Sequence, residues 1–133
     1  METNYDESMI FDLLNDDEFF ENEFQQIKNV FPMEDCQDIR NFLKNNPGVI
    51  IILNNVKPLL DKYVPYAKFH LRLDDDPLFT PQLQLMVKAH KQDFENGFKE
   101  DIMKINYSIR PLISKLNLFY EFFVFDGMIH EDC

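Results

Sequence analysis

The chain has few side chains of the kinds that bind transition metals: three histidines and two cysteines, scattered over 133 residues. Zinc sites need about four nitrogen, sulfur or oxygen ligands in tetrahedral geometry, and no spacing here fits such a site. The terminal run His130-Glu131-Asp132-Cys133 has four ligand types in a row. Consecutive side chains rarely converge on one ion, so we interpret this run as a frayed tail. The sequence predicts no metal site and no cofactor.

Acidic and nucleophilic side chains also form no recognisable catalytic pattern. The aspartate run at residues 74–76 lacks the spacing, the turn glycine and the final glutamate of a calcium loop, so we interpret it as a solvated turn. The remaining candidate nucleophiles are Cys36, Ser108 and Ser114. Cys36 fits the apolar face of a helix better than a site beside a histidine. We therefore predict no catalytic residue.

Basic and apolar side chains alternate in two neighbouring segments, residues 68–73 and 83–90. Such alternation predicts strands, and the turn-rich segment 74–81 between them predicts an antiparallel hairpin. Matching the apolar faces makes paired residue numbers sum to about 156, with Leu71 opposite Leu85. One face of the hairpin then carries a basic set: Lys68, His70, Arg72, Lys88 and His90. This set predicts docking of an anion or an acidic segment; the alternative is a solvated surface partly paired with Glu121.

Acidic residues are concentrated at the N-terminus, where residues 1–27 contain nine of the 24 acids and none of the 13 bases. Apolar side chains are interleaved with these acids, a pattern typical of segments that order when they meet a partner. The candidate contact residues for a partner are Phe11, Leu14, Asp16, Asp17 and Phe20. The alternative is a short arm that packs on its own domain.

The overall charge of −11 excludes several partner classes. Proteins that bind nucleic acid backbones or anionic lipid surfaces derive much of their affinity from basic residues, so we expect neither direct nucleic acid binding nor membrane docking. No positively charged start precedes an apolar run, and no apolar run approaches the roughly 20 residues that span a bilayer. We expect a cytoplasmic protein whose two cysteines form no disulfide framework.

Apolar spacing predicts helices at residues 17–31 and 35–45, the first ended by Pro32. Residues 49–63 favour a helix broken at Pro58 over a buried strand. Another helix is expected from about Asp93 to 107 or beyond, with Gly97 inside it and a bend or restart at Pro111. An aromatic third strand is predicted at 118–125.

This order of elements predicts an α+β fold: N-terminal helices, an antiparallel β-hairpin, a helix and a third strand, in a single layer of sheet packed by helices. The third strand has two available neighbours, because either hairpin strand would accept it. We expect an acidic, flexible arm at residues 1–16, one domain at 17–127 and a flexible tail at 128–133.

Residues 47–127 carry short motifs: Tyr63-Val64-Pro65 after a helix, Asp76-Pro77-Leu78 after a strand, and a helix leading into a final strand. On these motifs the segment resembles a small uncharacterised α+β family of archaeal and bacterial proteins. Relatives commonly have phenylalanine in place of Val64, glutamate in place of Leu78, and tryptophans after the helix, which this chain lacks. The family has no assigned activity, so the resemblance implies no catalytic residues.

Three hypotheses for function follow. The leading one is an interaction or regulatory protein without catalysis, antitoxin-like in neutralising a basic protein partner through the acidic arm. The second is a ligand-binding module or enzyme that reads an anionic metabolite at the basic hairpin face. The third is a homo-oligomer joined through the aromatic strand at 118–125.

Overall fold

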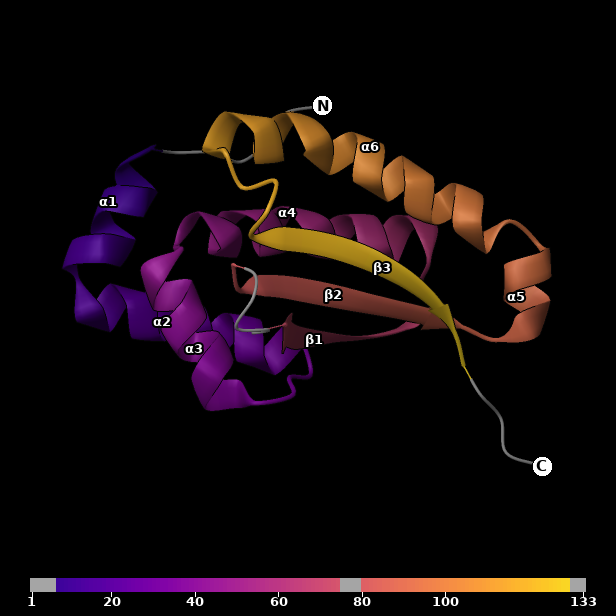
Figure 1. The fold of residues 1–133 in the computed structure, drawn as a ribbon, viewed down its shortest axis with the longest axis horizontal. Coiled ribbons are helices and arrows are strands. Elements are labelled where there is room, and N and C mark those ends of the chain that lie inside the picture. The colour runs from indigo at the N-terminus through magenta and orange to yellow at the C-terminus, as the bar shows by residue number, and fades with distance from the viewer. Residues whose placement is uncertain (1–6, 75–79, 130–133) are drawn as a thin grey trace.

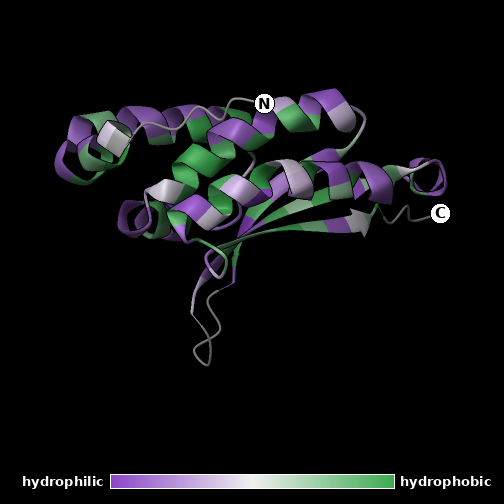
Figure 2. Ribbon diagram, turned by 90° about the horizontal axis from the view of Figure 1, so that it is seen from above, coloured by the Kyte–Doolittle hydropathy of each residue, from purple (hydrophilic) through white to green (hydrophobic). Residues whose placement is uncertain are grey.

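The protein is an α+β fold in which helices pack on a three-stranded sheet, as expected (Figures 1 and 2). The computed structural model describes residues 7–74 and 80–129. Four helices come first: α1 (Glu7–Asn15), α2 (Asp17–Val30), α3 (Cys36–Asn45) and α4 (Gly48–Tyr63). They are followed by β1 (Lys68–Asp74), β2 (Gln82–Ala89), α5 (Lys91–Glu95), α6 (Phe98–Leu116) and β3 (Phe122–Met128). In Figure 2 the helices lie to one side of the sheet.

Helix α2 begins at a side-chain cap and ends before a proline. The Asp16 carboxylate accepts a hydrogen bond from the Phe19 N–H at 3.1 Å, which satisfies one of the free donors of the first turn. Phe20, Phe24 and Ile27 are buried, so the predicted apolar face is confirmed. The prediction that order begins near Asp17 was wrong, because α1 precedes α2 and buries Leu13.

Helix α4 runs unbroken through Pro58, so the predicted break in this segment was wrong. A proline removes one intrahelical hydrogen bond, here the bond to the Asn54 carbonyl. Asn54 and Pro58 are both exposed, so water can bond the freed carbonyl. The apolar run Val49–Leu53 is completely buried, which holds this helix in the core.

The predicted single helix around Gly97 is two helices. Gly97 has φ 101°, a left-handed conformation that separates α5 from α6 and that glycine adopts without steric cost. Helix α6 continues through Pro111, where both Pro111 and the exposed Tyr107 four residues earlier face solvent. None of the helices in the described ranges is both long and apolar enough to cross a membrane.

The hairpin has the predicted register, with Leu71 opposite Leu85 and Arg72 opposite Gln84. The strand β3 lies beside β2 and runs parallel to it, so the sheet order is β1-β2-β3 and the sheet is mixed. The predicted start of this strand at residue 118 was four residues early, because residues 119–121 form a turn after α6. The outer edge of β1 is bridged by Met33, whose neighbours exchange hydrogen bonds with Leu71.

Candidate functional site

The strongest candidate interaction surface is the outer side of α1 and the start of α2, which we name the acidic helix surface. It comprises the exposed residues Phe11, Asp12, Leu14, Asp16 and Glu18. Helix α1 is anchored by Leu13, which has no exposed surface, while Phe11 is 67% and Leu14 is 53% exposed. Positions three apart in a helix are neighbours on its surface, so Phe11 and Leu14 form one apolar patch beside carboxylates.

Two acidic side chains of α2 form ion pairs with basic side chains of α3. Lys44 Nζ donates to Asp17 Oδ1 at 2.6 Å, and Arg40 pairs with Glu21. The hydrogen bond and the positive charge of Lys44 lower the pKa of Asp17 below its ordinary value of 3.8. Asp17 therefore ties α2 to α3, whereas the sequence had suggested it as a partner contact. In the described part of the chain, no base forms an ion pair with Asp12, Asp16 or Glu18.

Phe20, also expected as a contact residue, lies in the core with no exposed surface. Its ring stacks on that of Phe24, with centroids 6.2 Å apart. Lys44 Nζ and the Arg40 guanidinium lie 4.6 Å and 5.6 Å from the Phe20 ring centroid, which allows cation–π attraction. A partner cannot touch this ring without unfolding the junction of α2 and α3.

The structure brings four of the five expected hairpin residues to one face of the sheet: Lys68, His70, Arg72 and Lys88. His90 lies one residue beyond the end of β2, at the N-cap of α5, so it is not part of the strand pairing. His70 Nε2 lies 2.9 Å from Glu34 Oε2, and Arg72 donates to Gln84 Oε1 at 3.0 Å. His70 and Arg72, two of these four side chains, are therefore already bonded to other side chains of the protein.

Toward β3, the same face of the sheet is apolar. Across β2 and β3, Met86 lies opposite Phe125 and Gln84 opposite Phe123. The two phenylalanine rings are 4.7 Å apart, and Phe123 is exposed. Four pockets in the described residues have linings without the basic side chains of this face.

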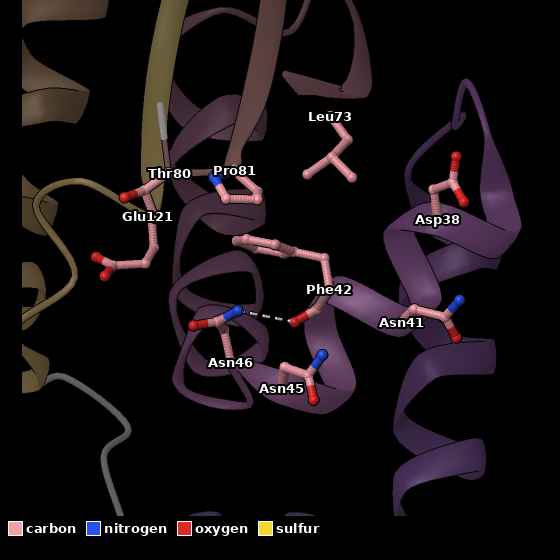
Figure 3. Close-up of a pocket in the computed structure, with 9 residues that line it drawn as sticks. All are labelled: Asp38, Asn41, Phe42, Asn45, Asn46, Leu73, Thr80, Pro81 and Glu121. Atoms are coloured by element: carbon pink, nitrogen blue, oxygen red, sulfur yellow. Dashed lines mark hydrogen bonds between the residues drawn. The ribbon is translucent and has the colours of Figure 1, made fainter. Parts of the chain in front are cut away.

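A pocket of about 320 Å³ lies where the C-terminus of α3 meets one end of the sheet (Figure 3). We name it the polar pocket; its lining residues are Asp38, Asn41, Phe42, Asn45, Asn46, Leu73, Thr80, Pro81 and Glu121. The sequence did not indicate it, because residues 45 and 46 carry no motif of a site and Glu121 was considered only as a partner of the basic hairpin side chains. No spacing in the sequence indicates that these segments meet.

Metal-ligating side chains do not gather in the described parts of the chain: no three histidine, cysteine or acidic residues lie close enough to hold an ion. Cys36 is a half-buried free thiol against the core, as its place on the helix predicted. Asp75, Asp76, His130 and Cys133 lie outside the described residues.

No protein-family model matches the chain, and comparisons with curated proteins and with solved structures found no similar protein. The resemblance of residues 47–127 to a prokaryotic α+β family therefore stays a proposal based on short motifs. Function is best argued from the surfaces of the molecule.

Proposed function

We propose that this protein is an interaction protein that binds a basic, partly apolar segment of another protein through the acidic helix surface. The observation that supports this proposal most is the exposure of Phe11 and Leu14 beside carboxylates that lack a basic partner in the described residues. Single exposed apolar residues are ordinary, but adjacent ones rimmed by like charges are typical of docking sites.

The physical roles of the two kinds of side chain differ. Burial of the Phe11 and Leu14 side chains would supply most of the affinity, since each buried large apolar side chain contributes roughly 1.5–3 kcal/mol. The carboxylates would select a basic partner and speed its association, which is what charge complementarity contributes most. A basic partner would thereby be neutralised, in the manner of an antitoxin.

Anion binding at the hairpin face has less support. An anion would have to compete with Glu34 for His70 and with Gln84 for Arg72. The basic side chains of this face line none of four pockets among the described residues that could exclude water from a bound anion.

Capture from a native extract tests the proposal. Deletion of residues 1–22 would be a poor probe, because it removes Leu13 and Phe20 from the core. The sharper variant is Phe11→Ala with Leu14→Ala, which removes the exposed patch and keeps good helix formers. The matched control is Met103→Ala with Tyr107→Ala, which removes two exposed apolar residues from α6.

We expect wild type and control to capture the same basic protein in stoichiometric amount, released by salt, and the Phe11/Leu14 variant to lose it. Equal capture by all three proteins, or capture only of neutral and acidic proteins, would contradict the proposal. Circular dichroism of each variant checks that the helices remain folded.

A further inference from the structure

The polar pocket has the donor and acceptor balance of a site for an organic cation. Its walls carry two carboxylates, Asp38 and Glu121, and the amides of three asparagines. None of the nine described residues that line it is a lysine, arginine or histidine. An anion would therefore meet repulsion there, whereas a cation would meet oxygen acceptors on several sides.

Glu121 shows that one of these acceptors is unsatisfied. Its Oε2 atom is buried, yet it accepts no hydrogen bond from any residue that the structure describes. Buried side-chain oxygens almost always have a partner, because an unpaired one loses its hydration without compensation. Figure 3 shows the Glu121 carboxylate directed away from Phe42, and Oε2 is closed off from solvent, so a bound donor would satisfy it only when this side chain turns into the pocket.

The end of α3 lies at the pocket. Asn45 is the last residue of this helix and Asn46 is its C-cap, but α4 begins at Gly48, so the positive end of the α4 dipole offsets the negative end of the α3 dipole here. The backbone N–H of Asn46 donates to Phe42 O, and so does its side-chain Nδ2 at 3.1 Å. The backbone N–H and one of the two side-chain N–H groups of Asn46 are thus used inside the helix end, and its side-chain oxygen can accept a hydrogen bond.

Apolar side chains line the rest of the pocket. Figure 3 shows the Phe42 ring between Pro81 and Asn46, with Glu121 and Asp38 on opposite sides of it. An aromatic face attracts an ammonium or guanidinium group, and an alkyl chain would contact Leu73 and Pro81. A volume of about 320 Å³ suits a small organic molecule and exceeds what a bare metal ion needs.

We propose that the polar pocket binds the ammonium or guanidinium group of an alkyl cation, with Glu121 as the charged acceptor. The cation has two possible sources, a free alkylamine or the side chain of a lysine or arginine in a protein. This inference uses none of the residues of the acidic helix surface, so its test is independent of the test of the proposed function.

Titration of the ¹⁵N-labelled full chain with n-butylammonium chloride, followed by NMR, tests the inference. We expect saturable shifts of the backbone amides of Asn45, Asn46, Thr80 and Glu121. The variant Glu121→Gln keeps the shape of the side chain and removes its charge, and should bind about tenfold more weakly or worse. The matched control Glu100→Gln removes an exposed acid of α6 and should bind like wild type.

Asp38→Asn provides a second test should Glu121→Gln fold poorly, because Asp38 is exposed on α3. Weaker binding is expected for it too. Equal shifts with sodium chloride or with n-butanol, or unchanged binding by both pocket variants, would overturn the inference.

Two further ligands distinguish the sources. Tighter binding of putrescine than of Nα-acetyl-lysine methylamide would indicate a free amine, and the reverse order a protein side chain. The Phe11→Ala/Leu14→Ala variant should bind n-butylammonium like wild type. Loss of binding in that variant would overturn the separation of the two sites.

Discussion

At the scale of single residues, the junction of α2 and α3 depends on charges laid over an aromatic core. Lys44 serves two groups at once, the Asp17 carboxylate and the face of Phe20. Arg40 does the same for Glu21 and Phe20. Some of the N-terminal acids, which resemble a partner motif in the sequence, therefore stabilise the protein's own packing: Asp17 and Glu21 pair with α3.

The Asp17–Lys44 pair predicts a pH-dependent contribution to stability. Because the pKa of Asp17 is lowered in the folded state, its contribution is present above its ordinary value of 3.8 and is lost as the pH falls through the lowered value. Asp17→Asn should therefore be slightly less stable than wild type at pH 7 and nearly equal to it at pH 2. Urea denaturation at both pH values measures this, and an equal difference at both would contradict it.

Leu13 and Leu14 are sequence neighbours with opposite environments, which makes them a matched pair. Leu13→Ala should lower the free energy of unfolding by about 2–5 kcal/mol, since it leaves a cavity in the core. Leu14→Ala should change it by about 0.5 kcal/mol or less, because the side chain is exposed. Denaturant melts of both variants test the position of α1; equal losses of stability would show that α1 is placed differently.

At the scale of elements, the break at Gly97 sets where α6 starts. Gly97→Ala should destabilise the protein by about 1 kcal/mol or more, because an alanine is strained at this positive φ. Gly97→Asn should lose less, since asparagine tolerates left-handed conformations better than alanine. Thermal unfolding of the two variants checks the order, and a stabilising Gly97→Ala would contradict the break.

The elements also show what could be predicted from sequence. The hairpin register followed from alternation alone, because a one-residue slip would expose Leu71 and Leu85. The parallel pairing of β3 with β2 could not be predicted, since nothing in residues 122–128 distinguishes one neighbour from the other. The continuity of α4 through Pro58 and of α6 through Pro111 was not predicted. The free-energy cost of a proline inside a helix depends on whether the freed carbonyl faces water, which only the tertiary structure shows.

The candidate sites were predictable to different degrees. The acidic, apolar N-terminus is visible in the charge layout, but whether Phe20 or Leu14 faces out depends on where α3 packs. The polar pocket joins residues of α3 with the strand ends near Leu73, Thr80 and Glu121. Its residues are up to 83 positions apart, so no local pattern indicates it.

At the scale of the whole molecule, the charge is unevenly distributed, with the bases confined to residues 28–133. Figure 1 shows α1 at one end of the molecule, away from β1 and α5. Such a layout gives the molecule one acidic end, which is where we propose that a partner binds. Binding there should be steered by long-range attraction, which salt screens over about 8–10 Å at physiological ionic strength.

The complex with the captured partner should therefore weaken as salt increases, mainly through slower association. Surface plasmon resonance between about 0.05 and 0.5 M salt measures this. Stability of the free protein serves as the control and should change far less over the same range. An association rate independent of salt would contradict an electrostatic role for the acidic helix surface.

Hydrogen–deuterium exchange of the full chain, alone and with the captured partner, tests the proposed interface most directly. We expect added protection in α1 and the first turns of α2, with little change in β1 and β2. Protection on the hairpin, with α1 unchanged, would contradict binding through the acidic helix surface.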